Sequence, residues 1–308
     1  MAHTYIRGTE LADEPYTPIA EVTLGLTLYL VEPVEWAQQA AARALDVFLQ
    51  HAPAQNLRWY TTSVLTEWQR AGTVGAQQVA SHLSYWQIQR PRHLFSFEIV
   101  DDTDVPSTAF AYREFDPTRG GPRASILEVT LPQMLDPQVL LRCAVEMSAL
   151  GPWSSGIGGY VGRWNRYKKN SAFWTQHRWA RRYLGLDLED AEEMSWLAVD
   201  ALPGVNWLTM IGKPLAGAAS IDLGLLAQHK WTHDVAVQPI GNGVLLRAGA
   251  LPTLGDRNQL EYPTAYSEVA RRLAPHFVEE PPELWGEFWR EKDTRAWQRR
   301  FIEPDGWL

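Results

Sequence analysis

The sequence predicts an α+β fold, with mixed or antiparallel strands packed against helices. Residues 22–31 place apolar side chains at every second position, which is typical of a strand with one buried face. Other segments, such as 34–51, repeat their apolar side chains at helical spacing. Strands and helices do not alternate strictly along the chain, and this argues against a doubly wound parallel sheet.

The first half of the chain is predicted to open with a strand and a long helix. The strand at 22–31 is followed by Pro33, and the alanine-rich segment 34–51 favours a helix that Pro53 stops. The other elements expected in this half are strands at 57–63, 93–100, 108–114 and 125–131 and helices at 74–87 and 137–150.

The second half continues the mixture of strands and helices. It begins with SSGIGGYVG at 154–162, which we interpret as a strand or loop whose glycines allow close backbone packing. Asn242-Gly243 between two apolar runs predicts a hairpin turn with positive φ at both central residues. The other elements expected here are strands at 205–211, 235–240 and 244–248 and helices at 171–183, 221–229, 263–273, 284–289 and 294–301.

No linker rich in Pro, Gly or Ser divides the chain, so we expect one compact unit of two closely packed lobes. The glycine-rich and basic region 154–169 is the best candidate for the boundary between them. The order of elements is loosely repeated after it, which is compatible with a distant internal duplication. The predicted parts are a loose N-terminal arm at 1–20, a domain at 21–275 with lobes 21–160 and 161–275, and an aromatic helical tail at 276–308 packed on the domain.

The composition indicates a globular protein of a reducing compartment. The 308 residues include 15 Trp and a single cysteine, Cys143, so a large core is available and an intramolecular disulfide is not. Cys143 lies in an apolar helical pattern and is expected to be buried. The N-terminus lacks a basic start followed by an apolar run, and no stretch has the roughly 18 apolar residues of a membrane span. We therefore expect a cytoplasmic protein with no membrane contact.

Motifs for catalysis, metal binding or cofactor binding are not recognisable. His229 and His233 have the spacing of zinc ligands but no third ligand, and the glycines at 156–159 lack the Lys-Ser/Thr of a phosphate loop. A triad could in principle be assembled from distant positions by Ser154, Ser155 and His177 together with one of the many carboxylates. We therefore predict no catalytic residue, no metal and no cofactor.

Several segments resemble one bacterial family. They are LRWYTTS at 57–63, GVNWLTMIG at 204–212, NGVLLRAGALPTLGDRN at 242–258 and YPTAYSEVARRLAP at 262–275. In this order they resemble the type VI immunity family, formerly a domain of unknown function, over roughly residues 20–275. The GVNWLT and VLLRAG segments are the specific part of this resemblance.

The resemblance implies an immunity protein that neutralises an effector toxin of the type VI secretion system. The effectors of the family include VRR-type nucleases, and the immunity protein covers their active or substrate-binding surface without catalytic residues of its own. The implied partner is a cognate toxin encoded by a neighbouring gene. Within the matching segments, Trp207 is expected in the core, and Asp256 and Asn258 in a turn after the last hairpin.

The net charge of −8 suits a nuclease target, because a groove that holds nucleic acid must be basic. The same charge, without a basic stripe, argues against direct binding of this chain to nucleic acid. The candidate toxin-contacting residues form one acidic stretch, Asp187, Glu189, Asp190, Glu192 and Glu193. A solvated helix face explains this stretch without a partner. A hydrolase-like enzyme and an adaptor of the secretion machinery stay as alternative functions, and the oligomeric state is left open.

Overall fold

The computed structural model describes most of the chain. The described residues are 6–10, 17–31, 34–63, 65–71, 94–115, 123–188, 190–283 and 291–307. The helices predicted at 74–87 and 284–289 and the candidate residue Glu189 lie outside these ranges.

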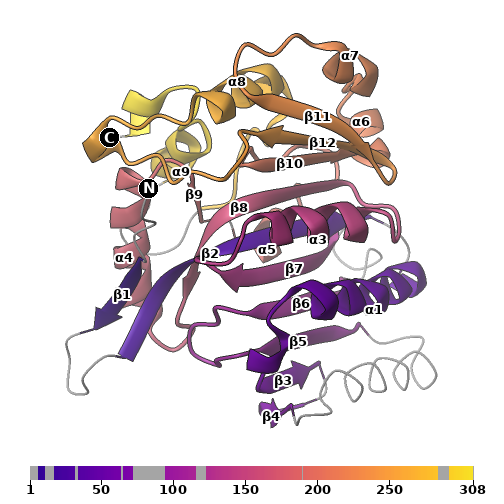
Figure 1. Cartoon of the computed structure of the whole chain (residues 1–308), viewed down its shortest axis with the longest axis vertical. Helices are drawn as coiled ribbons and strands as arrows, with labels where there is room; N and C mark the ends of the chain where they lie inside the picture. The colour runs from indigo at the N-terminus through magenta and orange to yellow at the C-terminus, as the bar shows by residue number, and fades with distance from the viewer. Residues whose placement is uncertain are drawn as a thin grey trace.

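The described strands form one twelve-stranded sheet, in which neighbours run antiparallel except for the short parallel pair β8–β9 (Figure 1). Its order is β11-β12-β10-β8-β2-β7-β6-β5-β3-β4, with β1 paired to β2 and β9 to β8. The strands are β1 (Arg7–Glu10), β2 (Thr17–Leu30), β3 (Trp59–Thr62), β4 (Gln69–Arg70), β5 (Ser96–Val100), β6 (Ala109–Arg113), β7 (Ser125–Pro132), β8 (Ser155–Trp164), β9 (Leu186–Asp187), β10 (Leu208–Gly212), β11 (Val235–Ile240) and β12 (Gly243–Ala248).

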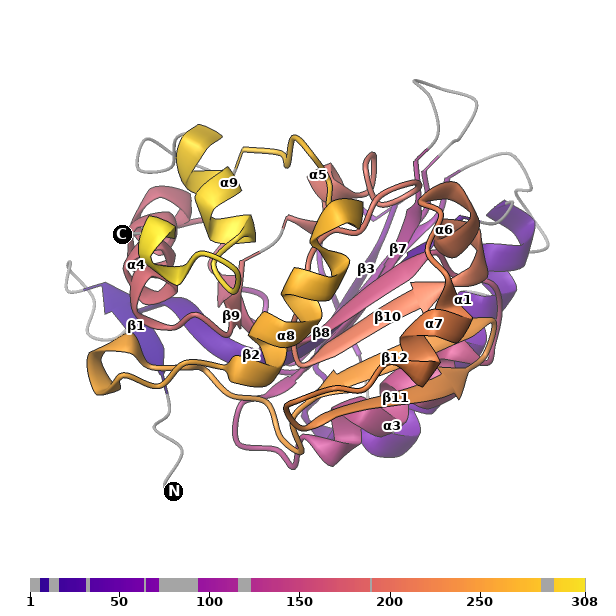
Figure 2. The ribbon, with the colours of Figure 1, turned by 90° about the horizontal axis from the view of Figure 1, so that it is seen from above.

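Helices lie on both sides of this sheet, which confirms the predicted α+β class. On one side, α1 (Val34–His51) and α3 (Gln138–Ser148) pack against each other and against the central strands, whereas α5, α8 and α9 lie on the other side (Figure 2). The remaining helices are α4 (Lys169–Arg182), α5 (Ala191–Met194), α6 (Lys213–Ala218), α7 (Leu223–Gln228), α8 (Thr264–Leu273) and α9 (Glu291–Gln298), with short 3₁₀ helices η1 (Ala54–Asn56), η2 (Arg257–Gln259), η3 (Ala274–His276) and η4 (Pro304–Trp307).

The first predicted strand is present as β2, but it begins earlier than the alternating pattern. Its apolar side chains Leu24, Leu26 and Leu28 are buried as expected. Residues 7–10, which we expected in a loose arm, form strand β1 and pair with the start of β2. The segment before Val22 is largely polar, and backbone hydrogen bonding needs no apolar side chains, so the pattern did not reveal this pairing.

The glycine-rich segment is the central strand β8, which pairs with both β2 and β10. A Cβ added at Gly159 would lie 2.3 Å from Oδ1 of Asn206, and one at Gly156 would lie 2.5 Å from the Leu28 side chain. A Cβ at either position would press on a buried neighbouring side chain, so glycine lets these side chains lie close to the strand. Because β8 joins strands from both expected lobes, the two halves share one sheet, and their division into lobes stays a prediction.

The predicted hairpin is formed by β11 and β12, but its turn differs from the prediction. Ile240 pairs with Gly243, so the two turn residues are Gly241 and Asn242. Gly241 has a φ of +44°, and Asn242 does not have a positive φ. The prediction of positive φ at both Asn242 and Gly243 is therefore wrong. A two-residue turn that begins with glycine can reverse the chain with positive φ at its first position alone.

Expectations about buried side chains are confirmed. Trp207 is fully buried, and its Nε1 donates a hydrogen bond to the carbonyl oxygen of Gly249 at 3.0 Å. Cys143 is also fully buried, and burial raises the pKa of its thiol to about 12, so the thiol is unreactive at neutral pH. The side chains of α8 that were predicted to face inward are buried, namely Tyr266, Ala270 and Leu273.

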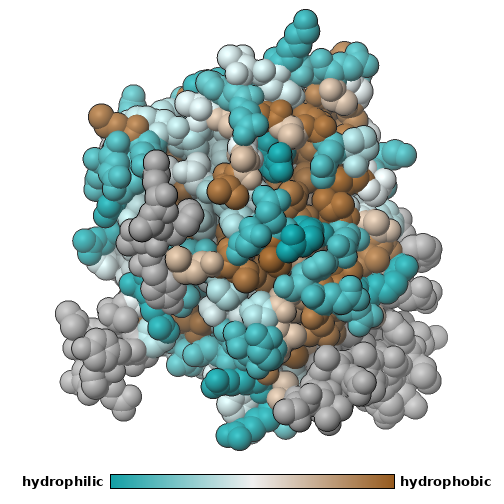
Figure 3. All heavy atoms as spheres, viewed as in Figure 1, coloured by the Kyte–Doolittle hydropathy of each residue, from teal (hydrophilic) through white to brown (hydrophobic). Residues whose placement is uncertain are grey.

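The surface on the side of α1 and α3 mixes apolar and polar side chains. Apolar side chains gather over α3 and the β11–β12 hairpin, with polar ones around them (Figure 3). None of the helices in the ranges given above is both long and apolar enough to cross a bilayer.

Candidate interaction surface

The acidic stretch leads from strand β9 into the short helix α5. Asp190 caps this helix, because its Oδ1 accepts hydrogen bonds from the backbone N–H groups of Glu192 and Glu193 at 3.0 and 3.2 Å. Such a cap satisfies N–H groups that have no partner within the helix. Burial raises the pKa of the half-buried Asp190 carboxyl. The side chains of Glu192 and Glu193 are exposed, so α5 presents negative charge to solvent.

The other side of α5 is apolar and anchors the helix on the sheet. Ala191 and Met194 belong to a small buried cluster that includes Tyr29 of β2 and Ile126 of β7. Tyr29 and Ile126 are cross-strand partners, so the helix packs over the junction of these two strands. The amphipathic character of this short segment places its carboxylates outward.

Arg123 ties α5 to the start of strand β7. Its Nε donates to Oγ of Ser195 at 2.7 Å, and its Nη2 donates to the carbonyl oxygen of Glu192 at 2.9 Å. The guanidinium carbon lies 3.4 Å from the ring centroid of Phe115 and 4.4 Å from that of Trp196. The negative faces of these two rings attract the positive guanidinium group and stabilise it in this position. Arg123 therefore fixes the position from which α5 presents its carboxylates.

The four predicted contact residues that the structure describes differ in their exposure to solvent. Asp187 lies in β9 and is only 3% exposed, because β9 pairs with the central strand β8. It is therefore not a surface carboxylate, contrary to expectation. Glu189 lies outside the described residues. The structure brings together Asp190, Glu192 and Glu193 at α5, and we call these three residues the α5 acidic surface.

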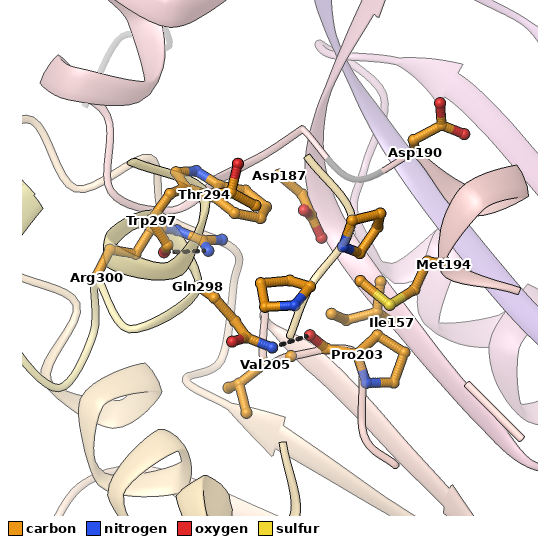
Figure 4. Close-up of a pocket in the computed structure, with 13 residues that line it drawn as sticks. Ile157, Asp187, Asp190, Met194, Pro203, Val205, Thr294, Trp297, Gln298 and Arg300 are labelled. Carbon is orange, nitrogen blue, oxygen red and sulfur yellow. Dashed lines mark hydrogen bonds between the residues drawn. The ribbon is translucent and has the colours of Figure 1, made fainter. Parts of the chain in front are cut away.

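A narrow recess lies beside the α5 acidic surface (Figure 4). Asp187 and Asp190 line it together with apolar side chains, which include Ile157 of β8, Met194 of α5 and Trp297 of α9. Its free volume is about 20 Å³, which is little more than one water molecule needs. The recess therefore suits the tip of a single side chain and is too small for a cofactor.

Hydrogen bonds from α9 and the residues after it hold the walls of the recess in place. Nε2 of Gln298 donates to the carbonyl oxygens of Pro203 and Val278 at 3.3 and 3.0 Å. Nε of Arg300 donates to the carbonyl oxygen of Leu184 at 2.7 Å. The C-terminal segment is thus joined to the loops on either side of α5.

The two histidines with metal-ligand spacing lie in the segment between α7 and β11. The ring centroid of His229 lies 4.5 Å from that of Trp231, in an edge-on contact. The backbone N–H of His233 donates to Glu268 at 2.8 Å. No group of three or more His, Cys, Asp or Glu that could hold a metal ion is found in the described parts of the chain.

The serine and histidine considered for a triad have different surroundings. Oγ of Ser154 donates to the carbonyl oxygen of Val199, at 3.4 Å. The His177 ring lies between Trp174 and Trp307, with centroid distances of 6.5 and 6.2 Å. Burial, followed by the charge of nearby Arg181, lowers the pKa of His177.

Comparison with known proteins identifies the family. The sequence profile described as "Type VI immunity for VRR-NUC" matches residues 40–301. The chain belongs to this family. The match includes α5, Arg123 and the recess, and it confirms the resemblance found in the sequence segments.

A solved structure shares the fold. The Pseudomonas aeruginosa T6SS protein PA0821 is similar with a TM-score of 0.77 and 18% sequence identity, over 98% of this chain and 89% of that chain. At this level of identity the similarity shows the fold alone. No protein with curated annotation matches the sequence.

Sequence reasoning missed Arg123 and the recess. Arg123 is separated by 69 residues from Glu192 and by 72 from Ser195, and no local pattern connects them. The recess likewise collects side chains from distant strands and helices. For Asp190 a local signal exists, because an Asp followed three residues later by Glu193 matches a capping box.

Proposed function

We propose that this chain is an immunity protein that binds a cognate type VI effector toxin and blocks it by covering its active or substrate-binding surface. The family match over residues 40–301 carries this proposal. Neutralisation of this kind requires a complementary surface and no catalytic site. The proposed role is therefore non-enzymatic, and the proposed partner is an effector encoded by a neighbouring gene.

The proposed target is a nuclease that acts in the cytoplasm. The family description names VRR-NUC, and a nuclease needs positive charge to hold a phosphate backbone. The net charge of −8 on this chain complements such a surface and accelerates the encounter between the two proteins. An effector that cuts nucleic acid inside the cell must be met there, and this supports a cytoplasmic location for the immunity protein.

Within this function, the α5 acidic surface is proposed as part of the toxin contact. Its carboxylates stand on a helix that Arg123 and the apolar cluster hold in place. Preorganised groups lose less conformational freedom on binding than flexible ones. The recess beside them has room for the tip of one side chain only, and the carboxylates of Asp187 and Asp190 in its lining favour a cationic tip.

A growth assay in a bacterial host tests the proposal. The neighbouring effector gene is induced alone and then together with this chain, and the two proteins are purified through a tag on one of them. We expect killing by the effector alone, rescue by co-expression, and recovery of a complex. Killing that persists although both proteins are well expressed would contradict the proposal.

A nuclease assay with purified proteins separates binding from catalysis. Cleavage of plasmid DNA by the effector is measured while the immunity protein is titrated in. Inhibition that is complete near equimolar protein indicates neutralisation by binding. Complete inhibition by a small fraction of an equivalent would indicate that the chain acts on the effector as an enzyme.

A further inference from the structure

Leu260 has a strained backbone in the loop that follows β12. It is the C-terminal cap of the 3₁₀ helix η2 and has a φ of +57°. In this left-handed conformation the Cβ atom approaches the following carbonyl oxygen, so residues other than glycine rarely adopt it. Among the described residues, Leu260 and Ser220 are the two residues other than glycine that have a positive φ.

The side chain of Leu260 is also open to solvent. It is 76% exposed, the highest value among the large apolar residues in the described ranges, and Tyr262 is 43% exposed. Glu261 lies between them and is exposed as well. An apolar side chain that remains in water gains no burial energy. Burial of the Leu260 side chain therefore does not offset its backbone strain.

The loop that carries Leu260 is held rigidly. The carboxylate of Asp256 accepts hydrogen bonds from Nε and Nη2 of Arg182, at 3.0 and 2.7 Å, and from the backbone N–H of Asn258 at 3.0 Å. The backbone N–H of Glu261 donates to the carbonyl oxygen of Asp256 at 3.0 Å. These bonds fix the chain on both sides of Leu260, so its exposed position belongs to the folded structure.

We propose that Leu260, with Tyr262 beside it, is an anchor that inserts into an apolar pocket of the effector whose rim is positively charged. This inference rests on the proposed function, because it takes the effector as the partner. A strained, rigidly presented side chain is the arrangement expected where a partner supplies the missing burial. The exposed carboxylate of Glu261 and the net charge of −8 complement a rim of cationic residues, the charge required of a surface that holds nucleic acid.

The substitution Leu260→Gly separates the side chain from the backbone conformation. Glycine adopts a positive φ without steric cost, so the midpoint of thermal unfolding is expected to stay unchanged or to rise. The Kd for the purified effector, measured by calorimetry, is expected to increase about tenfold or more, as for other anchor residues. Leu260→Ala also removes the side chain and is expected to weaken binding to a similar extent.

Two matched variants serve as controls. Ser220→Gly relieves the same kind of backbone strain at φ +55° without removing an apolar side chain. Leu225→Ala truncates an apolar side chain of α7 that is 56% exposed in ordinary helical backbone. Both variants are expected to keep the wild-type Kd.

The outcomes distinguish the inference from the proposed function. A wild-type Kd for Leu260→Gly, with the wild-type chain binding the effector, overturns the anchor and leaves the immunity function intact. A wild-type chain that fails to bind the effector overturns both. Sedimentation of the purified chain without the effector tests a second copy as the partner. A wild-type dimer that Leu260→Gly converts to a monomer would show that Leu260 binds a second copy, and it would overturn the assignment to the effector.

Discussion

Glu128 of β7 and Arg163 of β8 form an ion pair across β2, the strand that lies between them in the sheet. Nη1 of Arg163 lies 3.0 Å from Oε1 of Glu128, and Nη1 of Arg113 donates to Oε2 at 2.6 Å. Burial by itself would raise the pKa of Glu128, but the charges of Arg163 and Arg113 outweigh burial and lower this pKa to about 2. The carboxylate therefore stays charged and joins three strands of the sheet.

The substitution Glu128→Gln is expected to destabilise the protein by about 3 kcal/mol at pH 7, because two half-buried guanidinium groups lose their shared carboxylate. The folded-state pKa of about 2 lies below the ordinary value of 4.5. The stabilisation is therefore complete above pH 4.5 and is lost as the pH falls toward 2. Urea unfolding between pH 7 and pH 3 should show the difference from wild type shrinking. A difference that is constant over this range would show that the ion pair is not its source. Glu193→Gln, at an exposed position, is the control.

Arg182 and Asp256 connect the end of α4 to the loop before α8, and the bond lowers the pKa of Asp256. Asp256→Ala removes both this pair and the cap of η2, and we expect a loss of about 2 kcal/mol in unfolding free energy. Asp256→Asn keeps an acceptor for the N–H of Asn258 and should lose about half as much. Arg182→Lys keeps the charge but cannot reproduce the paired hydrogen bonds. Denaturant unfolding measures all three variants, and equal stability of Asp256→Ala and wild type would refute the prediction.

Arg123 is expected to control the mobility of α5. Arg123→Lys keeps a positive charge but cannot donate to Ser195 and Glu192 while lying flat against Phe115 and Trp196. Amide hydrogen exchange in residues 190–198 should accelerate by about tenfold, while exchange in the central strands stays the same. Arg299→Lys, which alters the surface pair with Glu303, is the control. If the exchange rate in 190–198 is unchanged, the hydrogen bonds of Arg123 do not hold α5 in place, and its apolar contacts do.

The elements that the sequence predicted correctly have local signals. The alternation around Leu24 marks β2, and the apolar spacing around Tyr266 marks α8. A turn at Asp256 and Asn258 was also predicted, and in the structure the carboxylate of Asp256 accepts a hydrogen bond from the backbone N–H of Asn258. Strand order was not predictable, because β8 meets β2 and β10 only through contacts between distant parts of the chain.

The candidate site was predicted in part for the same reason. A run of acidic residues indicates negative charge, but it does not show which side chains reach solvent. Asp187 is buried because β9 pairs with β8, and that pairing depends on the whole sheet. The strain at Leu260 likewise has no sequence signal, since the loop residues alone do not specify a positive φ there.

Reversal of charge at the α5 acidic surface tests whether it contacts the effector. The double substitution Glu192→Lys and Glu193→Lys leaves the cap at Asp190 in place but removes the ion pair between Glu192 and Arg123, so hydrogen exchange in 190–198 is compared with wild type to verify that α5 stays in position. We expect at least a tenfold increase in Kd, carried mainly by slower association, and a weaker dependence of binding on salt. The matched control is Glu279→Lys with Glu280→Lys, an exposed pair whose reversal changes the net charge by the same amount. Stopped-flow association at two salt concentrations compares the variants. An equal decrease of the association rate in the two double variants would assign the effect to overall charge. A decrease that occurs only in the variant at 192 and 193 would locate the contact at α5.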